Sequence, residues 1–149
     1  MPKTLWDAGN RRELVDRLNR LKPDATPLWG RMNAPQMVAH LVGWMRMANG
    51  ELKTVHMHKP MRFPVVKQMV IYWLPWPKGV PTAPELLSRE KYDFALELAS
   101  FRRYLAEYER RPDPKLAWPV HPAFGSLTVK EWGALGYRHT DHHLRQFGV

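Results

Sequence analysis

Apolar side chains recur at helical spacing in four long segments of the chain, and this periodicity constrains the fold more than any other feature. The segments run from about Ala8 to Leu21, Asn33 to Asn49, Ser88 to Arg110 and Thr128 to Phe147. In each, apolar residues return every three or four positions, which places them on one face of an α-helix. No segment shows an alternating strand pattern of comparable strength. The sequence therefore predicts an all-α protein.

Two of these helices begin at recognisable capping residues. Asn33 is followed by Pro35 in the first turn and by Gln36 at the third position, and Thr128 is followed at the third position by Glu131. Both are capping-box patterns, in which two side chains satisfy backbone N–H groups at the start of a helix. The helix after Asn33 would turn one stripe inward, formed by Met37, His40, Leu41, Trp44, Met45 and Ala48.

Residues 51–84, between the second and third long helices, are the least regular part of the chain. They are rich in proline and contain one short apolar stretch, for which we predict a helix between about Pro64 and Trp73. A connection as long as residues 51–84 suits a helix bundle in which one connection crosses over the helices. We therefore expect residues 1–149 to form a single domain, a four-helix bundle with a long irregular connection between its second and third helices.

Composition narrows the chemistry and the location of the protein. The 149 residues include no cysteine, so a transition metal would need nitrogen or oxygen ligands, and a cysteine nucleophile is excluded. The longest apolar stretch is interrupted by Lys67 and Gln68 and is too short to span a bilayer. The first residues lack a signal-peptide pattern. We expect a soluble, cytoplasmic protein without a membrane partner.

The chain is basic, with 23 lysine and arginine residues against 14 acidic ones and a formal charge of +9. The basic residues are spread along the chain, with no run longer than a pair such as Arg11-Arg12. Solvated helix faces account for this pattern better than a polyanion-binding surface does. We therefore expect scattered positive charge and no specific nucleic-acid partner. A homodimer is compatible with the sequence.

Three of the seven histidines lie within five residues, at His139, His142 and His143. His139 and His143 are one turn apart on one helical face, a spacing at which two imidazoles can bind one metal ion. His40 lies on the apolar stripe of an earlier helix, where an unpaired polar ring is costly. Two interpretations remain open. The three rings either bind one divalent ion, for which zinc, nickel and iron are suited, or are buried residues hydrogen-bonded to neighbours.

Other polar residues lie near these histidines along the helices. Gln36 precedes His40 by one turn and Gln146 follows His143 by almost one turn, so either glutamine could orient a ligand or a bound water. His142 lies about 60° around the helix from His139, which makes it a supporting residue, a solvent-facing residue or an alternative ligand.

Asp141 and His121 are two further polar residues that could belong to a site. Asp141 is expected to point away from the histidine face, which makes it a poor general base. His121 precedes Pro122 in a loop, where it could overhang the mouth of the bundle, although loop histidines are usually exposed. The sequence contains no nucleophile elbow, phosphate-binding glycine loop or dinucleotide fingerprint. Any chemistry would therefore depend on the metal.

The chain contains four motifs: PLWGRMNAPQMVAHL at 27–41, HPAFGSLT at 121–128, Glu131-Trp132, and HTDHHLRQF at 139–147. Their combination resembles the DinB/YfiT-like superfamily of four-helix bundles, and in particular a branch described as a domain of unknown function. In that superfamily the usual site has one histidine from the second helix and a His-x-x-x-His pair from the fourth. The resemblance implies His40, His139 and His143 as metal ligands.

Some members of the superfamily activate a low-molecular-weight thiol, and others look like hydrolases. We therefore expect a metal-dependent enzyme that activates a water or a small thiol toward a small-molecule substrate. Its pocket would lie near Trp44, His121, Phe124 and Trp132. The alternative is a non-catalytic binding or stress-response module on the same bundle. A polyanion-binding protein is a third, less favoured possibility.

Overall fold

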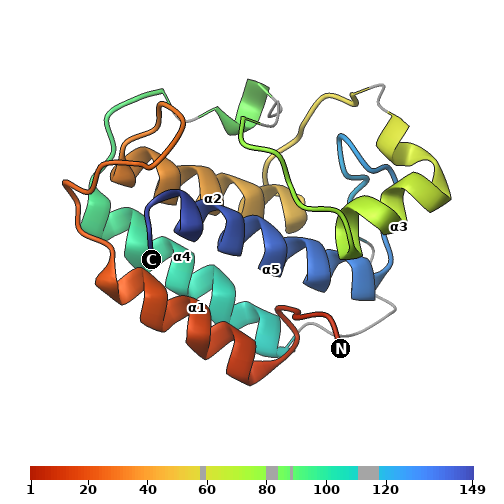
Figure 1. Cartoon of the computed structure of the whole chain (residues 1–149), viewed down its shortest axis with the longest axis horizontal. Coiled ribbons are helices and arrows are strands. Elements are labelled where there is room, and N and C mark those ends of the chain that lie inside the picture. The colour runs from red at the N-terminus through yellow and green to blue at the C-terminus, as the bar shows by residue number, and fades with distance from the viewer. Residues whose placement is uncertain (58–59, 80–83, 88, 111–117) are drawn as a thin grey trace.

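The computed structural model describes residues 1–57, 60–79, 84–87, 89–110 and 118–149, and these form an all-helical protein (Figure 1). The α-helices are α1 (Ala8–Arg20), α2 (Ala34–Ala48), α3 (Pro64–Tyr72), α4 (Phe94–Glu107) and α5 (Val129–Gln146). Three short 3-10 helices accompany them: η1 (Pro60–Arg62), η2 (Pro84–Leu86) and η3 (Tyr108–Arg110). Within the described ranges there is no β-strand, which confirms the predicted all-α class. The isolated bridge there joins His121 to Gly125.

Both predicted capping boxes are formed. The Asn33 side chain accepts from the Gln36 backbone N–H at 2.9 Å, and the Gln36 side chain accepts from the Asn33 N–H at 3.0 Å. Thr128 and Glu131 make the same reciprocal pair at the start of α5. These bonds satisfy N–H groups that have no partner inside the helix, which fixes where α2 and α5 begin. The short helix α3, with Pro64 in its first turn, also matches the prediction.

The third long helix begins later than the sequence predicts. We expected it from Ser88, a residue outside the described part of the chain, whereas α4 begins at Phe94. The reason is a cap: the Asp93 side chain accepts from the Leu96 N–H at 3.0 Å, so the residues just before it are extended or bent. At the other end, the last predicted turn is the 3-10 helix η3 rather than α-helix.

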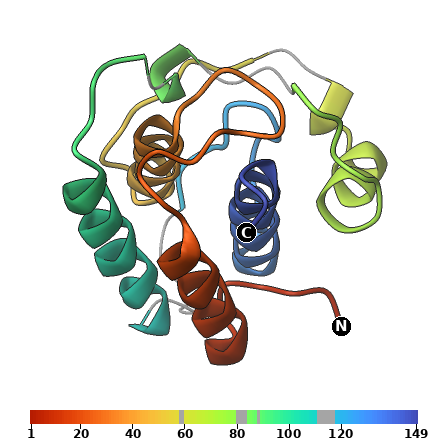
Figure 2. The same ribbon diagram turned by 60° about the vertical axis from the view of Figure 1, so that its left-hand side comes forward.

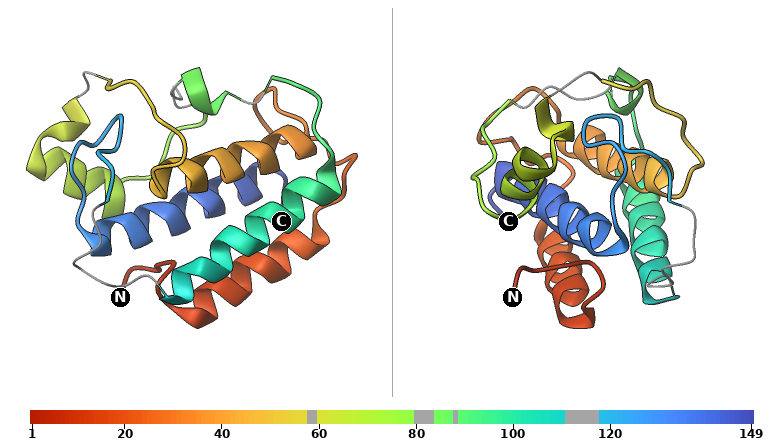
Figure 3. Two further views of the ribbon diagram at one scale, coloured as in Figure 1. Left: turned by 180° about the vertical axis from the view of Figure 1, so that it is seen from behind. Right: turned by 90° about the vertical axis from the view of Figure 1, so that its right-hand side faces the viewer.

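The long helices α1, α2, α4 and α5 lie alongside one another, and α3 lies outside them against α5 (Figures 2 and 3). Helix α2 packs against α4 and α5, and α1 packs against the same two helices. The loop before α2 and the described residues of the connection between α2 and α4 run along one side of the molecule (Figure 1). Residues of both segments, among them Trp29, Trp76 and Leu86, lie around the cavity that the histidines line.

The predicted inward stripe of α2 is buried along its whole length. On α4 the side chains of Leu98, Phe101 and Leu105 are buried, and that of Phe94 is partly buried. Tyr108, at the start of η3, is also buried. Fully burying each large apolar side chain contributes about 1.5–3 kcal/mol, so these stripes dominate the packing of the helices. Across the described residues, none of the helices has both the length and the apolar character needed to cross a membrane.

Candidate metal centre and its cavity

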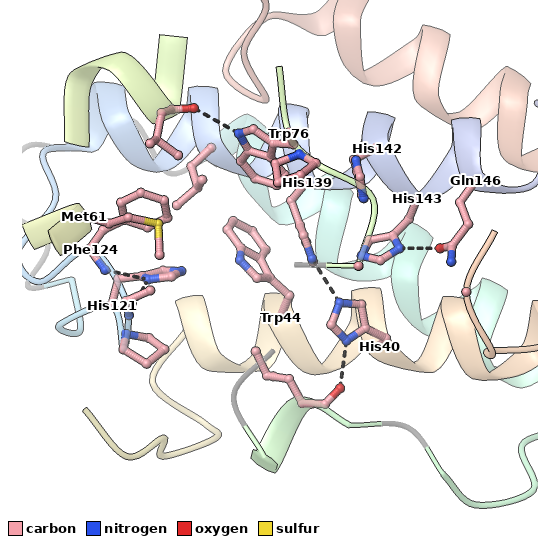
Figure 4. Close-up of a pocket in the computed structure, with 18 of the residues that line it drawn as sticks. His40, Trp44, Met61, Trp76, His121, Phe124, His139, His142, His143 and Gln146 are labelled. Carbon is pink, nitrogen blue, oxygen red and sulfur yellow. Dashed lines mark hydrogen bonds between the residues drawn. The ribbon is translucent and has the colours of Figure 1, made fainter. Parts of the chain in front are cut away.

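His40, His139 and His143 converge between α2 and α5 (Figure 4). One ring nitrogen from each lies within 4.8 Å of the others. The ring centroids are 4.9 Å apart for His40 and His139, 4.7 Å for His40 and His143, and 4.8 Å for His139 and His143. The three imidazoles therefore surround one point almost symmetrically. Three histidines so arranged can hold a metal ion.

The position of each histidine follows from the helix that carries it. His139 and His143 lie one turn apart on α5, and His40 lies on the buried stripe of α2 that packs against α5. His40 is buried, whereas the other two are partly exposed toward a cavity. The structure thus places His40 on the inner face, as the metal hypothesis requires, and brings all three predicted ligands together.

Hydrogen bonds hold two of the rings in a definite orientation. His40 Nδ1 lies 2.7 Å from the carbonyl oxygen of Leu86, which can only accept, so Nδ1 carries a proton and donates it. His143 Nδ1 lies 2.9 Å from Gln146 Oε1 and donates in the same way. In both rings the proton on Nδ1 leaves the Nε2 lone pair free to bind a metal. Histidine ligands of metals commonly have a partner of this kind.

Of the two glutamines that the sequence offered as supports, the structure selects Gln146. Besides accepting from His143, it donates through Nε2 to the Trp29 carbonyl at 2.8 Å. Gln36 has a different role, because it completes the capping box of α2 and donates to the Glu90 carbonyl at 3.2 Å. Gln146 is therefore anchored on both sides, by a helix and by the loop before α2.

His139 is held by packing instead of by a hydrogen bond on Nδ1. Its Nε2 lies 3.0 Å from His40 Nε2, and its Nδ1 is buried with no hydrogen-bond partner among the described residues. The rings of Trp44 and Trp76 pack around it, with centroids at 5.5 Å and 6.4 Å. Two tryptophans therefore limit the movement of this ligand.

Burial keeps the cluster uncharged. It is the main cause that lowers the pKa of His40, lowers the pKa of His139 well below its usual value, and lowers the pKa of His143 to about 3. Mutual repulsion among the protonated rings lowers the pKa of His139 and His143 further. All three rings are therefore neutral near pH 7, the state in which imidazole binds metals.

The remaining polar residues near the cluster have separate positions. His142 packs beside the Trp29 and Trp76 rings, each with a centroid distance of 5.8 Å, and lies outside the cluster. Asp141 points toward α1, as expected, and pairs with Arg17 at 2.6 Å.

His121, for which the sequence left open a position over the mouth of the bundle or an exposed loop position, is buried and only 8% exposed. Its Nδ1 accepts the backbone N–H groups of Ala123 and Phe124 at 3.2 Å and 3.3 Å, inside the tight loop closed by Gly125. A loop histidine is normally solvated, so only the signals for a tight turn, Pro122 and Gly125, pointed to this burial.

A cavity of about 480 Å³ opens beside the three histidines. Its walls are mainly aromatic, methionine and proline side chains, and the one formally charged side chain that lines it within the described residues is Arg31. Trp44, His121 and Phe124 line this cavity, in agreement with the predicted position of the pocket. Trp132 does not, because it is fully buried behind Trp44 and His121, with centroid distances of 5.8 Å and 5.6 Å.

Arg138, the residue before His139, fixes one wall of the cavity. Its guanidinium donates to the carbonyl oxygens of Val70, Ile71 and Leu74 at 2.8, 3.0 and 2.6 Å. These groups lie at the end of α3, where carbonyls have no partner within the helix. The same guanidinium lies 5.3 Å from the centre of the Trp76 ring. Helix α5 therefore carries two of the three metal-ligand candidates and also the anchor of the segment around Trp76.

Together, fold and site define an all-helical protein with a histidine cluster able to bind a metal ion. The chain belongs to the family described as "Protein of unknown function (DUF1569)", whose family model matches residues 6–148. This match includes the three clustered histidines and every wall of the cavity. No curated protein and no solved structure matches the chain. The function must therefore be inferred from the geometry of the site.

Proposed function

We propose that this protein is a metal-dependent enzyme of the DinB/YfiT type. In this proposal the four long helices are its bundle, and His40, His139 and His143 bind one divalent ion, zinc, nickel or iron. The observation that carries the proposal is the convergence of three neutral imidazoles, two of which present Nε2 because Nδ1 is bonded elsewhere. A set of three histidines leaves positions open for a water or a substrate, as in catalytic zinc sites.

A divalent ion held by three neutral ligands keeps its double charge and lowers the pKa of a bound water or thiol. The protein's own residues would supply orientation and exclusion of water. Leu86 and Gln146 fix two of the rings, and Trp44 and Trp76 shield the third. No carboxylate lines the cavity among the described residues, so a released proton would pass to solvent.

The size and character of the cavity support our proposal for the reaction class. The cavity has the size of a small-molecule site and is mainly apolar. We infer hydrolysis of a small electrophile, or transfer of a low-molecular-weight thiol to one. One observation favours the alternative, a binding or stress-response module without catalysis. The 3.0 Å distance between His40 Nε2 and His139 Nε2 is also that of a direct hydrogen bond between two imidazoles.

Metal analysis of protein purified without an affinity tag separates these possibilities. Wild type should contain a stoichiometric divalent ion, and His143→Ala should lose it because one of three ligands is gone. His142→Ala is the matched control and should retain the ion, since His142 lies outside the cluster. A metal content that is low in all three proteins, after growth and dialysis with added zinc, nickel or iron, would contradict the metal site.

Activity is tested separately. Metal-loaded wild type and His139→Ala should be compared on low-molecular-weight thiols with electrophilic partners, and on activated esters and amides. Turnover by wild type should disappear on chelation and return when the ion is added back. Equal rates in the two proteins would place the activity elsewhere. Bound metal without turnover in either would favour the non-catalytic module.

A further inference from the structure

His121 presents a single hydrogen-bond donor to the cavity. Its Nδ1 accepts two backbone N–H groups, from Ala123 and Phe124, so the ring proton lies on Nε2. That Nε2 has no hydrogen-bond partner among the described residues, although the ring is 8% exposed and lines the cavity. Figure 4 shows Nε2 pointing from the loop toward the cavity, away from the backbone that holds Nδ1. Because His121 lines the cavity, a ligand or a water in it can accept the hydrogen bond of this N–H group.

The ring is rigid and uncharged. It is enclosed by the rings of Phe124 and Trp132, at centroid distances of 5.0 Å and 5.6 Å. Burial, and to a smaller extent the positive charge of Arg62, lowers the pKa of His121 to about 3. Near pH 7 the ring is therefore neutral, and it offers one N–H donor in a fixed direction. The walls of the cavity are mainly apolar, so a neutral acceptor is less costly to bury beside this N–H group than an anion is.

His121 and the three clustered histidines lie on opposite sides of Trp44 (Figure 4). The cavity that both line is continuous, and its walls between them are apolar, including Trp44, Met61 and Phe124. A molecule that reaches the histidine cluster with its reacting end would therefore meet His121 with a different part. Between the two it would contact aromatic and methionine side chains.

We propose that the His121 Nε2–H is a recognition site for the carbonyl oxygen of a neutral, largely apolar substrate. The ligand class is a small molecule with an apolar or aromatic body and a ketone, ester or amide oxygen at the end away from the histidine cluster. This inference deepens the proposed function, since it describes the molecule that the metal centre would act on. His121 is a specificity-determining residue in this arrangement, and the ring orients the substrate without exchanging a proton.

The test compares two ligands of similar shape, acetophenone and ethylbenzene, which differ by one carbonyl oxygen. Ligand-observed NMR titrations, on protein from which a chelator has removed any metal, give the ratio of the two dissociation constants. His121→Phe keeps an aromatic ring and removes the donor. In this variant the dissociation constant of acetophenone, relative to that of ethylbenzene, should rise by about three- to tenfold. His142→Phe is the matched control, because it changes another cavity histidine in the same way, and its ratio should equal that of wild type. Benzoate should bind wild type more weakly than acetophenone.

A ratio unchanged by His121→Phe, or changed equally by His142→Phe, would overturn the proposal. If His121→Phe does not fold, wild type labelled with ¹⁵N-histidine gives the answer directly. The Nε2 resonance of one neutral histidine should move with acetophenone and stay in place with ethylbenzene; no such difference would equally overturn it. The ratio is measured on metal-free protein, so it does not depend on metal binding. A protein that fails to bind metal would refute the proposed function but would leave this ratio unchanged.

Discussion

Nδ1 of His143 lies 2.9 Å from Oε1 of Gln146, three residues further along α5, and the other end of that amide is bonded to the carbonyl of Trp29. A candidate metal ligand is thus linked through one side chain to the loop before α2. Gly30, in that loop, has a φ of 84°, and a Cβ built on it would lie 2.5 Å from the Gln146 amide nitrogen. The loop therefore approaches Gln146 as closely as it does only because residue 30 has no side chain.

Replacing Gln146 should weaken metal binding without removing it. In Gln146→Leu, His143 loses the acceptor that fixes its tautomer and ring orientation, and we expect metal affinity to fall about 10–100-fold. Gln146→Glu keeps an acceptor for Nδ1 and should bind metal more tightly than the leucine variant does. Competition with a chromophoric chelator measures both affinities. Equal affinities for wild type and Gln146→Leu would show that the amide does not support the ligand.

The stability contribution of His121 should depend on pH. Its folded-state pKa is lowered from 6.5 to about 3, mainly by burial. Between these values the unfolded chain binds more protons than the folded protein. The contribution is therefore complete above about pH 6.5 and is lost as the pH falls toward 3. In this window one such histidine changes the free energy of unfolding by about 1.4 kcal/mol per pH unit.

His121→Asn is the matched variant, because its side-chain oxygen can accept the Ala123 and Phe124 N–H groups but does not titrate. Urea unfolding at pH 7, 6 and 5, with chelator present, should show a shallower pH dependence for the asparagine variant. The other histidines contribute equally to both proteins and cancel in the difference. Parallel curves would mean that the ring is protonated in the folded protein or is not buried.

A methyl group at Gly136 should destabilise the protein. A Cβ there would lie 2.5 Å from Leu5 Cδ1 and 2.7 Å from the Trp44 ring, both in the packed core. Overpacking of this kind costs about 1–3 kcal/mol, which exceeds the gain of about 0.5–1 kcal/mol from replacing glycine in a helix. Gly136→Ala should therefore lower the urea midpoint.

Gly43→Ala is the control for that substitution. Gly43 is also a helical glycine, but its Cβ would meet Leu86 at 3.4 Å, an ordinary contact. The stabilisation gained by replacing a helical glycine should then exceed any packing cost, so the urea midpoint should stay the same or rise. A fall as large as that of Gly136→Ala would show that the closer contacts at Gly136 are not the cause of its destabilisation.

Arg138→Met should loosen the segment that covers the cluster. The substitution removes three hydrogen bonds to carbonyls at the end of α3 and the contact with Trp76. Backbone amides of residues 64–79 should exchange hydrogen at least about tenfold faster, which corresponds to about 1.4 kcal/mol of local stability. Arg145→Met is the control, since Arg145 is an exposed arginine on the same helix that pairs with Asp141. Similar exchange in both variants would exclude an anchoring role.

The sequence predicted the elements whose signals are local. Asn33 and Thr128 define the starts of α2 and α5 because each cap is made by residues three positions apart. The inward position of His40 followed from the apolar residues around it on one helical face. The start of α4 was misplaced because charged residues that suit an exposed helix precede Asp93, and the cap at Asp93 was not recognised.

The supports of the site were less predictable, because they depend on contacts between distant segments. The bonds from His40 to Leu86 and from Gln146 to Trp29 join residues 46 and 117 positions apart. Helical periodicity places a side chain on a face but does not say which loop covers that face. Gln36 and Gln146 were for this reason equivalent in the sequence and differ in the structure. The burial of His121 depends in the same way on the turn that it closes.

The acceptor for His40 is a backbone carbonyl in the connection between α2 and α4, and this limits how that connection can vary. Exchanging the side chain of Leu86 retains the carbonyl oxygen, so this bond places no demand on the identity of residue 86. Deleting or inserting a residue within η2 would shift the carbonyl and leave His40 Nδ1 without its acceptor. Among related proteins we therefore expect changes of length in this connection to occur on either side of η2 and to spare the turn itself.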